Sequence, residues 1–170
     1  MIKISYFKNP YGELIIGDYQ GKLCLCDWRY RKTRSKIDDR IQNFFNTVYI
    51  EQNSLLIEKT INQLTEYFKN QRTFFHLPLI FAGNNFQKIV WNELLNIPYG
   101  KTLSYIDLAQ KIGNKKAVRA VATANGANAI SIIIPCHRVL GSKGELTGYA
   151  GGLSVKMKLL NLESPQLKLF

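Results

Sequence analysis

The sequence predicts an α+β protein of two domains, in which an antiparallel sheet with helices precedes a mostly helical domain. Short apolar runs separated by turn residues open the chain, a helical apolar repeat follows them, and short helices replace this pattern after Leu79. A chain of 170 residues is long enough to bury a hydrophobic core without disulfide or metal staples. We expect the domains to span residues 1–82 and 83–170.

Three strands should form the first part of the N-terminal domain. Apolar-rich runs at residues 2–6, 14–17 and 22–28 are separated by Asn9-Pro10-Tyr11-Gly12 and by Gln20-Gly21. This spacing is typical of antiparallel strands joined by tight turns. Residues 55–68 then place apolar side chains on one face of a helix, which should pack on the sheet.

The C-terminal domain should begin with two short helices. Residues 86–95 show helical apolar spacing, and this helix must end near Ile97-Pro98 because proline cannot continue it. A second helix should start at Ser104, whose side chain can cap the free amides while Asp107 closes a capping-box-like pair. Gly113 can supply the left-handed residue that ends this helix.

A third helix is predicted over residues 116–125, with two different faces. One face holds Val118, Val121, Ala122 and Asn125, and the other holds Lys116, Arg119, Ala120 and Thr123. Two short helices joined by a tight turn are a helix-turn-helix candidate, and the small side chains between the two cations permit very close approach to a surface. An Ala-rich helix packed in a core explains this stretch equally well.

The net charge of +11 comes from 23 Lys and Arg against 12 Asp and Glu. Such a charge favours attraction to a polyanion, either nucleic acid or an anionic membrane, although a generally basic solvated surface is the alternative. The N-terminus lacks the apolar run of a signal peptide, and no stretch reaches the roughly 18 apolar residues that span a bilayer. We therefore expect a cytoplasmic protein.

Three cysteines do not form a disulfide framework, because the number is odd and Cys24 lies only two residues from Cys26. A reducing compartment leaves Cys136 as a free thiol. His76 and the paired cysteines give an incomplete metal-ligand set with poor spacing, so we expect no metal.

The strongest chemical candidate is Cys136. Residues 130–134 are nearly continuous apolar sequence and predict a buried, strand-like segment that ends at Pro135-Cys136-His137-Arg138-Val139. A thiol is a strong nucleophile only as the thiolate, and His137 and Arg138 are the local groups that could lower its pKa. The alternatives are an inert buried cysteine and a structural, hydrogen-bonded histidine.

The Cys136 segment, followed by Gly148-Tyr149-Ala150-Gly151-Gly152, resembles the signature of the O6-alkylguanine-DNA alkyltransferases, also called methylated-DNA–protein-cysteine methyltransferases. Further blocks resemble that family in the same order: Phe86-Gln87-Lys88-Ile89-Val90-Trp91, Ile97-Pro98-Tyr99-Gly100-Lys101-Thr102, Ser104-Tyr105 and Ala117-Val118-Arg119-Ala120-Val121. The similarity is strong over residues 83–163 and weaker before them. It implies an N-terminal ribonuclease-H-like domain and a helical C-terminal domain with a winged helix-turn-helix.

The resemblance implies that Cys136 is the alkyl acceptor and that His137, held by Glu163, is a water-mediated base. Tyr105 resembles the residue that serves the leaving guanine and crowds the adjacent phosphate. Asn128 resembles a hinge between the recognition helix and the active-site strand. The implied reaction moves an alkyl group from guanine O6, and also from thymine O4, once per molecule and without a cofactor.

The implied partner is double-stranded DNA, bound in the minor groove by a monomer. Arg119 resembles a finger that fills the gap left by the flipped nucleotide, and the small outward residues Ala117, Ala120 and Thr123 would lie against the DNA beside it. The implied substrate pocket contains Val139, Tyr149, Ala150 and Trp91.

The sequence departs from the family at Ala129, where proline is common, so the hinge after Asn128 should be looser. Three other functions stay open. A non-catalytic alkyltransferase-like damage sensor would bind the lesion only, but that group replaces the acceptor cysteine. A thiol hydrolase could use Cys136, His137 and Glu163. A sequence-specific regulator would need side chains that read the major groove, which an Ala-lined face does not supply.

Overall fold

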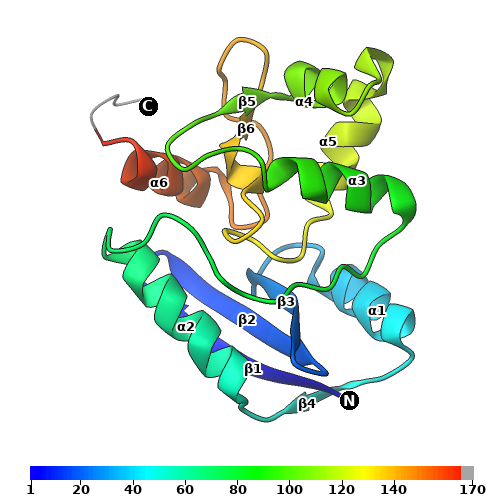
Figure 1. The fold of residues 1–170 in the computed structure, drawn as a ribbon, viewed down its shortest axis with the longest axis vertical. Coiled ribbons are helices and arrows are strands. Elements are labelled where there is room, and N and C mark those ends of the chain that lie inside the picture. Colours follow the sequence, from blue (N-terminus) through cyan, green and yellow to red (C-terminus); the bar gives the residue numbers. More distant parts are fainter. Residues whose placement is uncertain (166–170) are drawn as a thin grey trace. The chain divides into compact units, whose positions relative to one another are not determined.

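The computed structural model describes residues 1–165 and contains two compact units (Figure 1). One unit spans Met1–Gly83 and the other begins at Asn84. Within residues 1–165, no helix is long and apolar enough to cross a membrane.

A meander of three strands forms the centre of the N-terminal unit. Strands β1 (Ile2–Asn9), β2 (Gly12–Tyr19) and β3 (Lys22–Trp28) pair antiparallel, which confirms the three predicted strands and lengthens the first two. The β2–β3 turn is only Gln20-Gly21, and both residues have positive φ, 51° and 78°. Such a turn matches the twist of the two strands that it joins.

The sheet is mixed, so the prediction of a purely antiparallel sheet was wrong. Helix α1 (Arg34–Phe45) follows β3 and leads to a fourth strand, β4 (Tyr49–Glu51), which pairs parallel with β1 in the order β3-β2-β1-β4. A helical crossover returns the chain so that the next strand enters in the same direction. Neither element is predicted from the sequence, because only Ile37 and Ile41 of α1 are buried.

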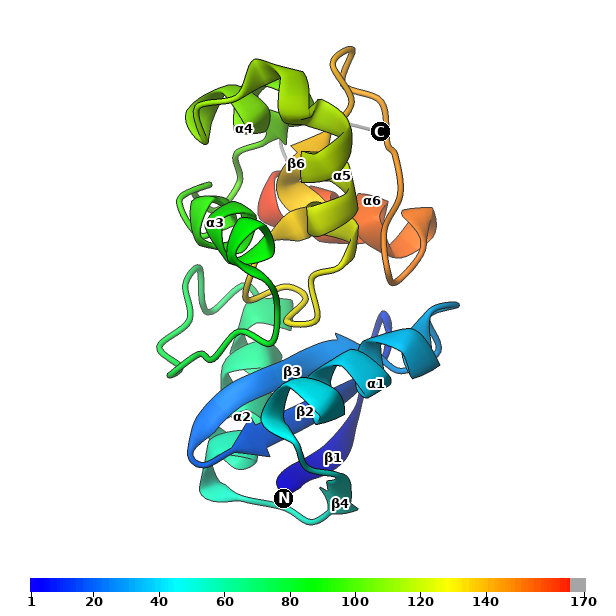
Figure 2. The same cartoon turned by 90° about the vertical axis from the view of Figure 1, so that its right-hand side faces the viewer.

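Both faces of this sheet are covered. Helix α2 (Leu55–Phe68) packs on β1, β2 and β3, as predicted, while α1 lies on the opposite side (Figure 2). Five successive residues of β2, from Leu14 to Asp18, are accordingly buried. Ser54 caps α2 by accepting a hydrogen bond from the Ile57 amide at 3.2 Å.

The C-terminal unit begins with the predicted helix α3 (Asn85–Leu94), which is capped by Asn84 and ends before Pro98. Helix α4 (Tyr105–Lys111) starts after Ser104, whose Oγ accepts from the Asp107 amide at 3.0 Å. The Asp107 carboxylate accepts from the Ser104 hydroxyl at 2.7 Å, so this pair closes between side chains. Gly113, with a φ of 86°, follows the end of α4 as predicted.

The third predicted helix consists of a 3-10 turn, η1 (Lys115–Ala117), and helix α5 (Val118–Gly126). Helix α5 packs on α3 and α4, with Val121 and Asn125 buried. Arg119, Ala120 and Thr123 are exposed. One face of α5 therefore stays open, which excludes a helix that is packed in the core on all sides.

The prediction of a strand at residues 130–134 was wrong, although the segment is buried as expected. The chain turns back there: the Ile134 amide donates to the Ile130 carbonyl at 2.9 Å, and Ile132 has a positive φ of 72°. A left-handed conformation is unfavourable for a β-branched residue, so surrounding contacts must hold this turn.

The last elements surround the Cys136 segment. The 3-10 turn η2 (Cys136–Arg138) runs directly into β6 (Val139–Leu140), which pairs parallel with β5 (Leu103–Ser104). Helix α6 (Leu153–Glu163) packs against η2. Helix α6 is not predicted from the sequence, because the charged residues Lys156 and Glu163 belong to its buried face.

Candidate active site around Cys136

Cys136 begins the η2 turn and is buried, with 4% of its surface exposed. Pro135 has φ −80° and ψ 61°, and the Cys136 amide donates to the Ile134 carbonyl at 2.8 Å. These values describe a tight three-residue turn centred on Pro135. The turn fixes the backbone that carries the thiol, and the covered site excludes bulk water from it.

Asn128 ties the end of α5 to the segment that leads to Cys136. Its Nδ2 donates to the Ile134 carbonyl at 2.9 Å, and its Oδ1 accepts from the Ile130 amide at 3.0 Å. One buried side chain thus holds both ends of the turn at residues 130–134, which explains why this segment does not extend as a strand. The geometry suits the hinge expected at Asn128.

His137 and Glu163 form a buried pair, with 2.7 Å between Nε2 and Oε1. Burial lowers the pKa of His137, so its imidazole is neutral at neutral pH. Burial alone would raise the pKa of Glu163, but His137 and Arg138 outweigh this effect and hold the pKa well below its usual range. Because Glu163 is a carboxylate, Nε2 of His137 carries the proton and Nδ1 offers its lone pair.

Arg138 holds Glu163 in place. Its Nε and Nη2 donate to the two Glu163 oxygens at 2.8 and 2.9 Å, and its Nη1 donates to the Ile97 carbonyl at 2.7 Å. Arg138 was expected as a group that could lower the pKa of the thiol, whereas its guanidinium binds Glu163. This two-bond geometry fixes the carboxylate plane and, through it, the His137 ring.

Lys156 is a buried cation that the sequence analysis missed. Its Nζ donates to the carbonyls of Val139 and Thr147, both at 2.7 Å, and to that of Gly148 at 3.4 Å. Burial lowers the pKa of Lys156 to about 8, and the negative charge of a Cys136 thiolate opposes this effect. A signal was present in the sequence, because Lys156 and Glu163 share one helical face with the apolar Leu159 and Leu160.

The expected pocket residues lie in different surroundings. Val139 is fully buried, whereas Tyr149 and Ala150 are half-buried. The Tyr149 ring stands edge-on to the His137 ring, with 6.4 Å between the centroids. The buried Trp91 donates from Nε1 to the Ala124 carbonyl at 2.8 Å and so joins α3 to α5.

The open face of η1 and α5 contains the residues that were expected to touch DNA. Arg119, Ala120 and Thr123 are exposed, and Ala117 is half-buried. The Thr123 hydroxyl donates to the Arg119 carbonyl of its own helix at 3.0 Å. The hydroxyl is therefore turned toward the helix backbone and does not project from this face. Charge favours a polyanion here, since η1 and α5 expose Lys115, Lys116 and Arg119 and contain no Asp or Glu.

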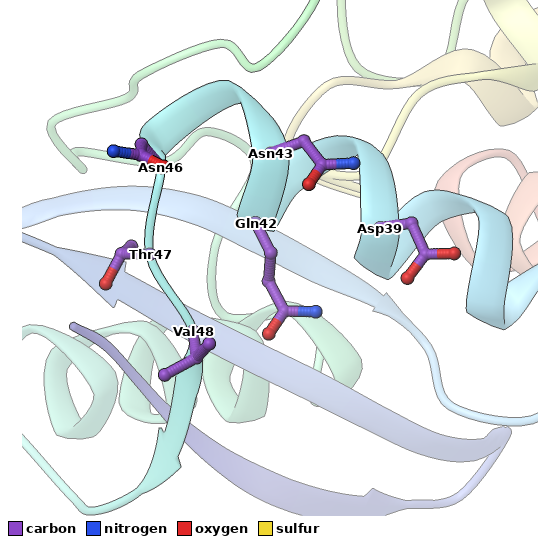
Figure 3. Close-up of a pocket in the computed structure, with 6 residues that line it drawn as sticks. All are labelled: Asp39, Gln42, Asn43, Asn46, Thr47 and Val48. Atoms are coloured by element: carbon purple, nitrogen blue, oxygen red, sulfur yellow. The ribbon is translucent and has the colours of Figure 1, made fainter.

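The N-terminal unit offers no comparable chemistry in its described pocket. That pocket, of about 360 Å³, lies along the end of α1 and the segment that leads to β4 (Figure 3). It is lined by Asp39, Gln42, Asn43, Asn46, Thr47 and Val48. These residues include neither a thiol nor a histidine. Among residues 1–165, no group of three or more His, Cys, Asp and Glu could hold a metal ion.

The other two thiols are poor nucleophiles. Cys24 and Cys26 are free and buried in β3. Burial raises the pKa of Cys24 to about 12, and burial raises the pKa of Cys26 above the range in which a thiol ionises in water. Neither thiol has a histidine as its chain neighbour. The reactive thiol predicted by this environment is therefore Cys136.

An exposed helix face and a buried cysteine beside a histidine–carboxylate pair are the features expected of a DNA-binding protein with a reactive thiol. The family profile described as "6-O-methylguanine DNA methyltransferase, DNA binding domain" matches residues 85–165. A methylated-DNA–protein-cysteine methyltransferase of Methanosarcina acetivorans is 41% identical, over 94% of this chain and 96% of the relative. Its namesake in Methanosarcina barkeri is 48% identical, over 95% and 96%.

Solved structures agree with this result. The O6-methylguanine methyltransferase of Mycobacterium tuberculosis matches with a TM-score of 0.82 and 35% identity, over 98% of this chain and 94% of that chain. The structure of the M. tuberculosis protein in complex with DNA also matches with a TM-score of 0.82, over 99% of both chains. The chain belongs to the methylated-DNA–protein-cysteine methyltransferase family.

Proposed function

We propose that this protein repairs alkylated DNA by moving the alkyl group from guanine O6 irreversibly onto Sγ of Cys136. The observation that carries the proposal is the 2.7 Å contact that Glu163 makes with His137, the residue next to this buried cysteine in the chain. It supplies a neutral, oriented base for a thiol that must be ionised before it can attack. The family relatives carry the corresponding activity in their names.

In the proposed reaction, Nδ1 of His137 takes the Cys136 proton through a water molecule. The Glu163 carboxylate stabilises the imidazolium that forms, through the bond to Nε2. The thiolate then attacks the alkyl carbon, the bond between that carbon and O6 breaks, and its electron pair goes to the guanine. Tyr105 serves the leaving guanine as a proton donor. A thioether is a poor leaving group, so each molecule reacts once and no cofactor is needed.

The proposed DNA interface is the face formed by η1 and α5. Its small residues Ala117, Ala120 and Thr123 would allow α5 to enter the narrow minor groove, where little base-specific information exists. The lesion must be flipped out, because a buried thiol cannot reach O6 of a stacked base. Arg119 would fill the gap left in the duplex. Val139, Tyr149, Ala150 and Trp91 are proposed to shape the pocket, which would also accept O4-alkylthymine.

We extend the proposal to the organisation of the chain. Residues 1–82 would form a ribonuclease-H-like domain, and residues 83–170 a DNA-binding and alkyl-acceptor domain with a winged helix-turn-helix. The helix pair α4 and α5 supports the second assignment, since the two helices pack together across a short turn. The protein would act as a monomer in the cytoplasm.

Replacing Arg119 with Ala should slow transfer from a base-paired lesion by roughly tenfold or more, because the flipped state loses the side chain that fills the duplex. Transfer from the same lesion in single-stranded DNA should change much less, since no duplex has to be opened. Single-turnover rates on both substrates measure this difference. Lys158→Ala, which removes an exposed cation of α6, is the charge-matched control. An equal loss on both substrates would show that Arg119 acts only as a positive charge.

The central test is the intact mass of the protein after mixing with excess duplex DNA that contains O6-methylguanine. We expect a gain of one methyl group, mapped to Cys136 by peptide analysis, and no change at Cys24 or Cys26. Binding of the lesion without a mass gain would favour a damage sensor. Product formation beyond one equivalent of protein would favour a thiol hydrolase, because only a hydrolase turns over.

A further inference from the structure

The connection between β3 and α1 carries the densest run of cations in the chain (Figure 2). Residues 29–36, which span this connection and the first turn of α1, include five basic residues and no acidic one. The five are Arg29, Arg31, Lys32, Arg34 and Lys36. Some of these cations are neutralised within the N-terminal unit and others face water. Those that face water determine what this segment can bind.

Two of the cations fix the backbone of the segment. Nη1 of Arg31 and Nη1 of Arg34 each donate to Oδ2 of the fully buried Asp27 at 2.9 Å. The Arg31 amide donates to the Trp28 carbonyl at 3.2 Å, and the Arg34 amide donates to the Arg31 carbonyl at 3.1 Å. Charge-assisted bonds to a buried carboxylate are among the stronger hydrogen bonds in proteins. The segment is therefore a pair of anchored turns with a defined outer surface.

Tyr30 lies on that outer surface. It is the most exposed aromatic residue among residues 1–165, at 76%. The guanidinium carbon of Arg29 lies 5.3 Å from the centre of the Tyr30 ring and 3.8 Å from the centre of the Tyr6 ring. Arg29 is also paired with Glu13, with 3.1 Å between Nη1 and Oε1. The sheet thus supports the Tyr30 ring through Arg29 while most of the ring stays in water.

Lys32 and Lys36 supply charge that no carboxylate offsets. Both side chains are exposed, and neither forms an ion pair with Asp or Glu in the part of the chain that the structure describes. Two residues of chain separate Lys32 from Tyr30, a span of at most about 7 Å. A supported aromatic ring beside free cations is the combination with which proteins hold single-stranded nucleic acid, because bases stack on the ring and phosphates meet the cations.

We propose that residues 29–36 bind an unpaired DNA strand, with one base stacked on Tyr30 and the adjoining phosphates held by Lys32 and Lys36. A duplex suits this surface less well, because its neighbouring base pairs cover the faces on which a ring could stack. Membership of a DNA-methyltransferase family selects DNA over an anionic membrane as the polyanion. The contact gives the N-terminal unit a hold on strands that are exposed when a duplex opens, and it does not depend on alkyl transfer.

The first test is photo-crosslinking of the full chain to a short oligothymidylate that contains one 5-iodouracil. Unlabelled duplex without a lesion is added in excess to occupy the proposed DNA interface on η1 and α5. We expect a crosslink at Tyr30, mapped by peptide mass analysis, because 5-iodouracil reacts with an aromatic ring that stacks on it. Crosslinks confined to the C-terminal unit would overturn the inference, as would loss of the Tyr30 crosslink when duplex is added.

The contribution of the ring is measured by the Kd for the same oligothymidylate under the same conditions. Tyr30→Ala should weaken binding by about tenfold, whereas Tyr30→Phe, which keeps the ring, should bind as the wild type does. Phe74→Ala is the matched control, because Phe74 is 57% exposed and lies 5.8 Å from the Arg72 guanidinium, outside the basic segment. An equal loss in both alanine variants would show that Tyr30 has no special role and would contradict the proposal.

The contribution of the cations is measured by the salt dependence of strand binding. Lys32→Gln combined with Lys36→Gln should reduce the slope of log K against log salt by about 1.4, since each phosphate contact on a single strand contributes about 0.7. Lys59→Gln combined with Lys69→Gln removes two exposed cations at α2 and should leave the slope unchanged. Equal slopes for the two double variants would rule out a phosphate contact at residues 29–36. Melting curves confirm that each variant is folded.

Discussion

Replacing Cys136 with Ser should abolish methyl transfer, with a loss of at least about a thousandfold in rate. A serine hydroxyl occupies nearly the same space, so the fold and the binding of the lesion should survive. His137 is neutral and oriented by Glu163, but a hydroxyl is far less acidic than a thiol, so almost none of it would be ionised for attack on an alkyl carbon. Intact mass after incubation with O6-methylguanine duplex measures the loss, and a band-shift titration measures the retained binding.

The matched control for this experiment is Cys26→Ser. Cys26 is also buried, but burial and the charge of the neighbouring Asp27 raise its pKa, and β3 contains no histidine. This variant should gain one methyl group at the wild-type rate, provided that it stays folded. Methylation of a Cys136→Ser protein at Cys24 or Cys26 would contradict the assignment of a single acceptor.

The second large effect is expected for Glu163→Gln. The substitution removes the negative charge that partners the buried Arg138 guanidinium and orients His137. Breaking a buried ion pair from one side typically costs about 3–5 kcal/mol of stability, because the remaining charge is left without compensation. Transfer should slow by about a hundredfold or more, since a neutral amide no longer stabilises the imidazolium. Urea unfolding and single-turnover rates measure the two effects separately.

The pH dependence of this variant has a definite sign. The pKa of Glu163 is depressed in the folded protein, so its contribution is present above the ordinary pKa of a glutamate and is lost as the pH falls toward the folded value. The stability difference between wild type and Glu163→Gln should therefore shrink on acidification. Glu66→Gln provides a control, because Glu66 pairs with Arg72 at 2.8 Å on the surface, where such pairs contribute about 0–1 kcal/mol. A difference that grew toward acid pH would contradict the ion-pair account.

Local sequence signals predicted much of the fold. Turn residues separated β1, β2 and β3, and helical periodicity located α2, α3 and α5. These elements are specified by neighbours a few residues apart. Helix α1 and strand β4 escaped the same reasoning, because α1 buries only Ile37 and Ile41 and β4 has three residues. The parallel pairing of β4 with β1 joins residues that are far apart in the chain.

The sequence by itself determined that Cys136 follows a buried segment, that His137 adjoins it, and that Arg119 and Ala120 share one face of a short helix. Only the tertiary structure decided that Glu163, 26 residues further along the chain, contacts His137 and also accepts hydrogen bonds from Arg138. It also decided that Lys156 is buried and donates to the Val139 carbonyl. The physical reason is that a charged side chain is stable inside a protein only when distant groups neutralise and hydrogen-bond it. Periodicity records which face of a helix is buried, whereas the partner of a buried charge depends on how separate elements pack.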